Sequence, residues 1–184
     1  MGEDKALLPF GGYSTLAEYQ HMRLSKIFDR VYISAKSDKF NFDMDIIEDC
    51  YEESSPLVGI VSIFERLDID EIFVLSVDAP FINRATIEEI YRDALLSKDA
   101  IVASSPNGIE PLCGIYRRTI LPKAKEFLKQ GNHRLQALLD SVETQIVKFN
   151  REVIFMNLNY PEEYNRAIDF KIKERNGNRI FCTI

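Results

Sequence analysis

One acidic residue stands where many α/β proteins bind their ligands. Asp78 follows Glu71–Val77, a short apolar run that is rich in β-branched and aromatic residues. Such a run predicts a strand buried on both faces, and Pro80 favours an end to the strand at this point. Asp78 would then lie at the carboxyl end of a central parallel strand, the edge where open α/β sheets bind ligands. The alternative is structural, because Asp also stabilises turns of the Asp-x-Pro kind.

Three further features could serve the same edge. Asp49 follows a short predicted strand, Met44–Ile47, and is a second carboxylate for this edge. Ser55 and Pro56 form an N-cap and first-turn pair that opens an amphipathic helix. The first amides of such a helix lack internal partners and can bind an anion, although an ordinary capped helix gives the same pattern. Lys5, taken by itself, indicates only a solvated surface charge.

The elements that must position these residues alternate between strand and helix. The sequence predicts strands at 30–34, 44–47, 71–77, 100–103, 111–116 and 146–149, and helices that begin near residues 15, 56, 83, 119, 134 and 161. This alternation is typical of a mostly parallel sheet with helices on both faces. Gly114, inside a predicted strand, indicates a close approach of another backbone segment. We therefore expect a single α/β domain, residues 1–184, with a Rossmann-like sheet.

Composition excludes several classes of partner. The chain has 184 residues and a net charge of −6, which argues against a surface that coats nucleic acid, because phosphate binding needs clustered Lys and Arg. No apolar run approaches the length of a membrane span, and the N-terminus lacks the pattern of a signal peptide. Cys50, Cys113 and Cys182 are far apart, so we expect neither a disulfide framework nor a zinc site, and a cytoplasmic protein.

Six segments together carry a resemblance to one family. They are MGEDKALLPFGG (1–12), EDCYEESSPLVGI (48–60), SVDAPF (76–81), EPLCGIYRR (110–118), GNHRL (131–135) and NLNYPEEY (157–164). In this order they resemble the LAGGxSxRMGxDK, D…GPLAGI, CDxPF, HP, G-x-R-R-like and N-x-N-x-P-E-E motifs of the molybdenum cofactor guanylyltransferases. The resemblance spans nearly the whole chain and implies the nucleotide-diphospho-sugar transferase-like variant of the α/β fold.

The resemblance implies an enzyme that transfers GMP from GTP to the terminal phosphate of molybdopterin and releases pyrophosphate. Joining two anions requires a divalent cation and positive donors, because repulsion and transition-state charge dominate the barrier. Asp78 matches the family's magnesium-binding aspartate, and a hard carboxylate oxygen suits Mg²⁺. Lys5 matches the lysine that neutralises the triphosphate. Asp49 matches the acidic residue on the nucleoside side of the pocket.

The remaining site residues follow from the same resemblance. Those expected at the nucleotide are Pro56, Leu57 and Gly59, and those expected near the pterin are Asn157 and Asn159. His133 and Arg134 are weaker candidates for contacting the second anion, with a plain surface role as the alternative. Other proteins of molybdenum cofactor synthesis, or acceptor enzymes, would be the protein partners.

The chain also departs from the family pattern. Ser55 replaces the first Gly of GPLAG, Ser76 replaces the Cys before the metal-binding Asp, and Glu110 replaces the His of HP. Only MGxDK of the first loop is present, so the first strand and its glycine-rich turn are expected to be missing before residue 1. That strand would lie between the strands at 30–34 and 72–77. We expect the apolar tail Ile180–Ile184 to fill this position, with residues upstream of the chain as the alternative.

Two other functions stay open from the sequence. A cytidylyl- or sugar-phosphate nucleotidyltransferase is the first, because base selection lies largely in the missing loop. A degenerate, non-catalytic nucleotide- or pterin-binding protein is the second, because the missing turn would bind phosphate. Pyrophosphate release from GTP, CTP or ATP in the presence of Mg²⁺ and molybdopterin distinguishes these functions.

Overall fold

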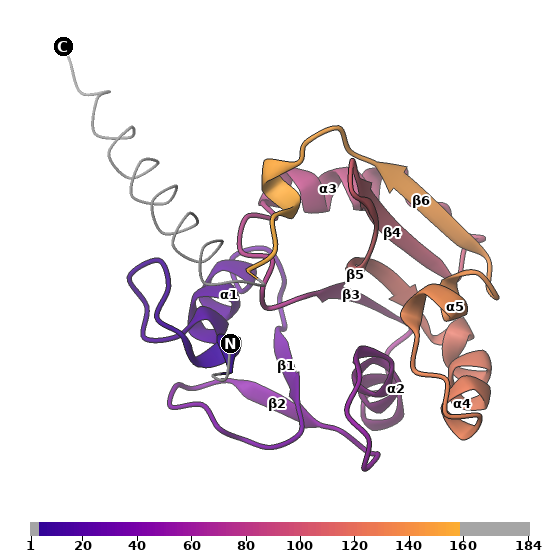
Figure 1. The fold of residues 1–184 in the computed structure, drawn as a ribbon, viewed down its shortest axis with the longest axis horizontal. Coiled ribbons are helices and arrows are strands. Elements are labelled where there is room, and N and C mark those ends of the chain that lie inside the picture. The colour runs from indigo at the N-terminus through magenta and orange to yellow at the C-terminus, as the bar shows by residue number, and fades with distance from the viewer. Residues whose placement is uncertain (1–3, 159–184) are drawn as a thin grey trace.

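The structure, a computed structural model, describes residues 4–158 of the chain, and within this range strands and helices alternate as predicted (Figure 1). The strands are β1 (Tyr32–Ala35), β2 (Asp45–Glu48), β3 (Glu71–Leu75), β4 (Ala100–Ser105), β5 (Gly108–Arg117) and β6 (Thr144–Lys148). The α-helices are α1 (Leu16–Leu24), α2 (Pro56–Arg66), α3 (Arg84–Asp93), α4 (Leu121–Lys129) and α5 (Leu135–Leu139). Short 3₁₀ helices are η1 (Lys5–Leu7), η2 (Arg118–Ile120) and η3 (Val153–Phe155). No helix in this part of the chain is long and apolar enough to cross a membrane.

The larger sheet has the strand order β3-β5-β4-β6. β4 and β6 are parallel, whereas β5 runs antiparallel to both β3 and β4. The short turn between Ser105 and Gly108 imposes this reversal, because a parallel connection needs a dozen or more residues. β3, β4 and β6 therefore share one direction, and β1 and β2 form a separate parallel pair. The predicted mostly parallel α/β fold is confirmed, with β5 as its one reversed strand among those described.

β3 differs from the prediction of a central strand buried on both faces. Among the described residues it is hydrogen-bonded to β5 alone, and Ile72–Leu75 are only half-buried. β4, with a neighbour on each edge, is the buried strand of this sheet. No strand within residues 4–158 joins β1 to β3, and the tail Ile180–Ile184 lies outside the described residues.

Helices cover both faces of the larger sheet, and β4 shows this most clearly. Ala100 and Val102 pack into a core with α2, α4 and α5, whereas Ile101 and Ala103 pack with α3 on the opposite face (Figure 1). The alternation follows from the period of a strand, in which successive side chains point to opposite faces. The prediction of helices on both faces is confirmed.

Gly114 permits a close approach of β5 to the backbone of β4. A Cβ atom at Gly114 would lie 2.3 Å from the carbonyl oxygen of Ile101, so no larger residue fits there. The register with β4 shifts after Val102, and Pro111–Cys113 form a bulge opposite it. The close approach predicted at Gly114 is confirmed.

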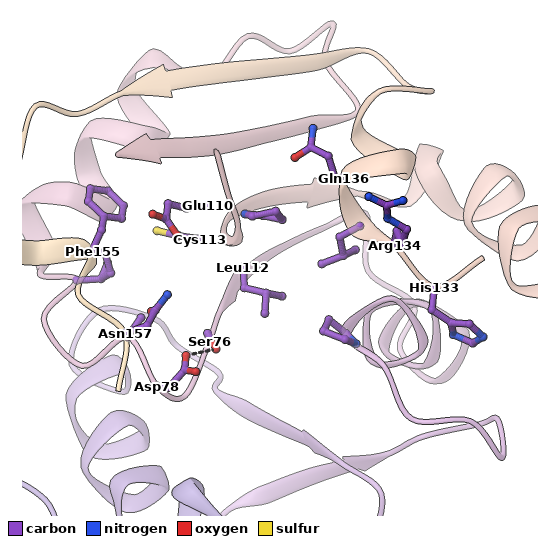
Figure 2. A pocket seen from close by; sticks show the side chains of 15 residues that line it. Ser76, Asp78, Glu110, Leu112, Cys113, His133, Arg134, Gln136, Phe155 and Asn157 are labelled. Carbon is purple, nitrogen blue, oxygen red and sulfur yellow. Dashed lines mark hydrogen bonds between the residues drawn. The ribbon is translucent and has the colours of Figure 1, made fainter. Parts of the chain in front are cut away.

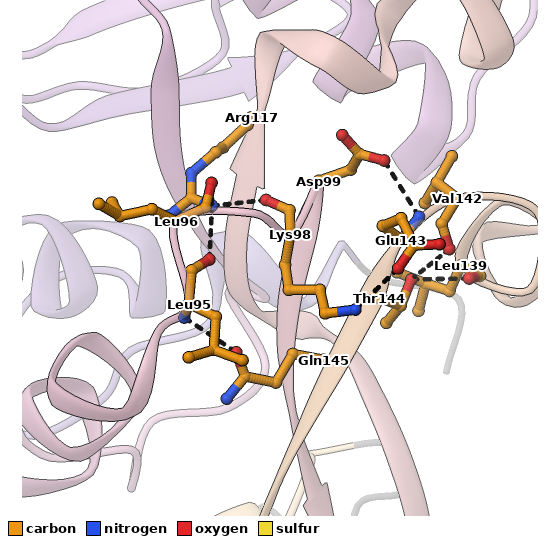
Figure 3. A network of polar contacts seen from close by, with 10 residues as sticks. All are labelled: Leu95, Leu96, Lys98, Asp99, Arg117, Leu139, Val142, Glu143, Thr144 and Gln145. Atoms are coloured by element: carbon orange, nitrogen blue, oxygen red, sulfur yellow. Dashed lines mark hydrogen bonds and ion pairs between the residues drawn. The ribbon is translucent and has the colours of Figure 1, made fainter.

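At the other end of this sheet, polar groups bond to one another (Figure 3). Arg117 donates from Nη1 to three backbone carbonyl oxygens of residues 95–98, and from Nε to the Glu71 carboxylate at 2.9 Å. Asp99 accepts from the Thr119 hydroxyl at 2.6 Å and from a backbone N–H at 3.0 Å. This network fixes the loop that leads into β4.

Candidate active site

Asp78 lies in the turn after β3, at the carboxyl end of that strand. The Ser76 hydroxyl donates a hydrogen bond of 2.5 Å to Asp78 Oδ1, and Lys5 Nζ from η1 lies 4.0 Å from Asp78 Oδ2. Both charged side chains keep part of their surface exposed, so a ligand can reach them. The structure thus brings together the two residues that the sequence predicts for the chemistry.

A buried glutamine that the sequence analysis missed holds the turn carrying Asp78. Gln20 Nε2 lies 3.2 Å from three backbone carbonyl oxygens of residues 76–79. Arg23, in the next turn of α1, donates to Gln20 Oε1 and to the carbonyl oxygen of Ile82. Burial lowers the pKa of Arg23. The available signal was a glutamine spaced four residues after a leucine on the apolar face of a predicted helix.

A pocket of about 380 Å³ opens beside Asp78 (Figure 2), a volume within the range of small-molecule sites. The polar and reactive side chains that line it are Ser76, Asp78, Glu110, Cys113, His133, Arg134, Gln136 and Asn157. Apolar contributions to the lining include Pro56, Ile82, Leu112 and Phe155.

The pocket has chemically different sides (Figure 2). His133, Arg134 and Gln136, from the turn before α5 and its start, form a polar side with one permanent positive charge. Glu110 lies on the opposite side, together with Cys113 and Phe155, which are both buried.

Several predicted residues therefore meet at this pocket. Pro56 and Asn157 line it with Asp78. The N–H of Leu158 donates to the carbonyl oxygen of Asp78 at 2.9 Å, which ties the segment carrying Asn157 to the Asp78 turn. Asn159 lies outside the described residues.

Asp49 belongs to a second group of residues and is not among those that line this pocket. Asp49 Oδ1 is 3.5 Å from the hydroxyl of Ser34, at the end of β1. A Cβ atom at Gly59 would lie 2.7 Å from the same hydroxyl oxygen, so a glycine there lets α2 approach both strand ends. Burial raises the pKa of Asp49, while the Ser34 hydrogen bond and the charge of Lys36 oppose this. The Leu57 side chain is fully buried in the core, so only its backbone can face a nucleotide.

A hydrogen bond connects α2 to the polar side of the pocket. Ser55 is the N-cap of α2, where it accepts from the Val58 N–H at 3.2 Å. The same hydroxyl is 3.0 Å from His133 Nδ1. The serine that replaces a family glycine therefore links the start of α2 to the turn that carries Arg134.

Glu110 is the second carboxylate of the pocket, which the sequence analysis noted only as a departure from the family. Ser105 donates a hydrogen bond of 2.7 Å to Glu110 Oε1. Burial raises the pKa of Glu110; the Ser105 hydrogen bond opposes this change, and the charge of Asp78 adds to it. The position of Glu110 depends on the β4–β5 register and its bulge, which the sequence does not display.

The residues around Asp78 fit a divalent cation that is shared with a bound phosphate. Within residues 4–158 no group of three or more His, Cys, Asp or Glu side chains could hold a metal by itself. Mg²⁺ keeps several waters and uses one or two protein carboxylates together with substrate phosphates. The Asp78 carboxylate, with the amide oxygen of Asn157 in the same pocket, supplies oxygen ligands of that kind.

Comparison with known families decides the class of this site. Residues 1–146 match the model of the MobA-like NTP transferase domain. The chain belongs to this family. Its members are nucleotidyltransferases, so the pocket and the Lys5–Asp78 pair lie in a nucleotidyltransferase fold.

Individual relatives agree with the family. The chain is 33% identical to a molybdenum cofactor guanylyltransferase of Campylobacter jejuni over 168 aligned residues. The alignment covers 90% of this chain and 87% of that protein. It is 32% identical over 177 residues to a Helicobacter pylori protein of the same name, and this alignment covers 95% of this chain and 86% of that protein. The fold matches the crystal structure of molybdopterin-guanine dinucleotide biosynthesis protein A from Archaeoglobus fulgidus, with a TM-score of 0.79 and 20% sequence identity. The match covers 94% of this chain and 92% of that one. The resemblance drawn from the six motifs is confirmed.

Proposed function

We propose that the protein transfers GMP from GTP to the phosphate of molybdopterin, forming the guanine dinucleotide cofactor and releasing pyrophosphate. The observation that carries the proposal is the pair of Lys5 and Asp78, 4.0 Å apart, at the edge of a pocket large enough for a small molecule. The names of the relatives support GTP and molybdopterin as the substrates.

In this reaction an oxygen of the molybdopterin phosphate attacks the α-phosphorus of GTP. The bond from the α-phosphorus to the bridging oxygen of the β-phosphate breaks, and pyrophosphate leaves with the electron pair. Both reactants are anions, so catalysis depends on their positioning and on compensating positive charge. Lys5 would supply that charge at the triphosphate as a compact ammonium group.

Asp78 would hold Mg²⁺, with Asn157 as a further oxygen donor. When bound there, Mg²⁺ supplies charge neutralisation at the phosphates. Ser76 and Gln20 would keep the Asp78 carboxylate and its turn in place, since one bonds the carboxylate and the other the turn's carbonyl groups.

The two groups of residues suggest separate places for the two substrates. Asp49, Gly59 and the backbone of Leu57 would serve the nucleotide at the start of α2, together with the backbone of Pro56, which lies between the two places because it also lines the pocket. Asn157 and Asn159, with Arg134 and His133, would serve the acceptor in the 380 Å³ pocket. The cysteine spacing supports a cytoplasmic setting, where proteins that use the cofactor would be the partners.

The experiment is a pyrophosphate-release assay with Mg²⁺, molybdopterin and GTP, CTP or ATP in turn. We expect release with GTP that depends on molybdopterin. Release with CTP in preference to GTP would contradict the proposed base and support a cytidylyltransferase. No release with any nucleotide, from protein that binds GTP, would support a non-catalytic binding protein.

A further inference from the structure

Glu110 is a carboxylate whose presence in this pocket needs an explanation. The proposed acceptor is an anion, and a second negative charge beside Asp78 would repel it. One oxygen of Glu110 accepts from Ser105 at 2.7 Å. Among the described residues, no other side chain donates to this carboxylate and no Lys or Arg forms an ion pair with it.

The surroundings of Glu110 make an unpaired carboxylate costly. Cys113 and Phe155 beside it are buried, and burial raises the pKa of Glu110. A half-buried acid without a cation is stable in its charged form only when N–H or O–H groups donate to it. Each carboxylate oxygen accepts two hydrogen bonds, so Glu110 has acceptor capacity left for a ligand.

A pterin ring offers the matching donors. Its 2-amino group and its N3–H lie side by side on one edge, so a single carboxylate can accept from both, as it does from a guanidinium fork. We propose that Glu110 binds this edge of the acceptor's pterin ring and thereby selects the acceptor; this inference rests on the proposed function.

The arrangement of the pocket agrees with this orientation. Glu110 and Phe155 lie together, across the pocket from Arg134, with Asp78 at a third side (Figure 2). A ligand with its ring against Glu110 and Phe155 keeps its phosphate away from the Glu110 carboxylate and toward Arg134 and the Mg²⁺ proposed at Asp78. The ring then meets an apolar and acceptor-rich side, and the phosphate meets the cationic one.

Asp49 provides an internal parallel. Guanine carries the same pair of donors as pterin, and Asp49 is a partly buried carboxylate on the side of the site expected to hold the nucleoside. The product of the proposed reaction joins two heterocycles with identical donor edges. The chain places one desolvated carboxylate in each of the two groups of residues, Asp49 beside α2 and Glu110 in the pocket.

The test compares two free heterocycles, pterin and lumazine, by titration calorimetry or fluorescence with the purified protein. Lumazine has a carbonyl oxygen in place of the 2-amino group, so it presents an acceptor where pterin presents a donor. The wild-type protein should bind pterin at least about tenfold tighter than lumazine. Glu110→Gln, whose amide accepts once and donates once, should lose this preference or reverse it.

Two further variants serve as controls. Glu126→Gln changes an exposed glutamate of α4 and should keep the wild-type ratio of pterin affinity to lumazine affinity. Glu110→Asp keeps the acceptor atoms on a shorter side chain and should keep the preference for pterin at weaker affinity. If Glu110→Gln does not fold, as judged by circular dichroism, the wild-type and Glu110→Asp ratios still decide, because a wild-type protein that binds both heterocycles equally overturns the inference.

Two rival roles for Glu110 predict different results. If Glu110 is a second metal ligand, the Glu110→Gln variant should need more Mg²⁺ for turnover, and the ratio of its affinities for pterin and lumazine should stay at the wild-type value. If Glu110 binds guanine instead, Glu110→Gln should raise the KM for GTP and leave the KM for molybdopterin unchanged. Either result overturns the inference while GMP transfer by the wild-type protein stands. Absence of GMP transfer in the wild-type protein overturns the proposed function, and this inference with it.

Discussion

Both ends of the larger sheet are rich in polar side chains, but the two ends differ in how fully these side chains are paired within the protein. At the end where β3, β4 and β6 begin, Arg117 donates to three backbone carbonyl oxygens (Figure 3) and, from Nε, to the Glu71 carboxylate. At the end where these strands finish, Asp78, Glu110 and Arg134 face a pocket (Figure 2). Among the described residues, Asp78 accepts from the Ser76 hydroxyl and lies 4.0 Å from Lys5, and Glu110 accepts from the Ser105 hydroxyl.

The difference separates structure from function. Buried polar groups in proteins are nearly always paired, because an unpaired group loses its hydration without compensation. The Arg117 end follows that rule and should contribute stability. The Asp78 end leaves bonding capacity for a ligand, so its residues should matter for turnover more than for folding.

The largest expected effect is on turnover, from Asp78→Asn. The substitution removes the charge that would hold Mg²⁺ while asparagine still suits the turn. We expect turnover to fall by about 10³-fold or more, since a metal contributes several kcal/mol to transition-state stabilisation. Steady-state pyrophosphate release measures the loss, and thermal unfolding should show a melting temperature close to that of the wild type. Normal turnover in this variant would mean that Asp78 is only a turn residue.

Arg117→Met tests the opposite end. The methionine keeps the apolar volume but leaves three carbonyl groups and the Glu71 carboxylate without their donor. We expect the free energy of unfolding to fall by about 2–4 kcal/mol, with the KM for GTP unchanged. Arg92→Met is the matched control, because Arg92 is exposed and, within residues 4–158, pairs with its neighbour Asp93 alone; it should cost less than about 0.5 kcal/mol in urea unfolding. Equal losses in the two variants would remove the distinction between the ends.

Lys5→Ala should act on the nucleotide rather than on the fold. Loss of the ammonium group should raise the KM for GTP by about 10- to 100-fold, because hydrogen bonds between charged partners are the strong ones. Lys5→Arg should restore only part of this, since a guanidinium fork does not replace a compact ammonium group. Lys129→Ala, at an exposed position of α4, should leave the KM unchanged. A Lys5→Ala protein with the wild-type KM would assign Lys5 to the surface.

The elements of the fold were largely predictable from the sequence, because each carries a local signal. Ser55 with Pro56 marked the start of α2, and apolar periodicity marked the strands and the sides of the helices. The burial of β3 was mispredicted, because an apolar run reports the hydrophobicity of a strand and not the number of its neighbours. The reversal of β5 was not predicted, because the strands expected at 100–103 and 111–116 left seven residues between them, whereas β4 and β5 extend until only two residues separate them.

The candidate site was predictable where a residue carries a motif and not where it depends on register. Asp78 and Lys5 stood in motifs, and the structure places them together. Gln20 acts through backbone carbonyl groups that are distant in sequence, and Glu110 depends on a bulge opposite Val102. Such long-range pairings leave no local pattern in one chain.

The smallest expected effect is a pH dependence of stability at Glu110. Its pKa is raised above the ordinary value of 4.5 in the folded protein, chiefly by burial. Between the unfolded and folded pKa values the folded protein binds more protons, so the free energy of unfolding falls as pH rises through this interval and stays lower above it. Glutamine does not titrate and can still accept from Ser105. Glu110→Gln should therefore gain stability relative to the wild type as the pH rises above about 4.5 and through the raised pKa of the folded protein.

Glu126→Gln gives the matched case of opposite sign. The hydrogen bond and charge of Lys123 lower the pKa of Glu126, so this carboxylate favours the folded state at neutral pH and loses that effect as the pH falls through its folded pKa. The glutamine variant should then lose stability relative to the wild type at neutral pH, by a small amount because the pair is exposed. Urea unfolding of the three proteins across the pH range measures both trends. A stability difference for Glu110→Gln that is flat with pH would show that the pocket carboxylate carries no folding cost, and the contrast between the two ends of the sheet would then rest on hydrogen bonding alone.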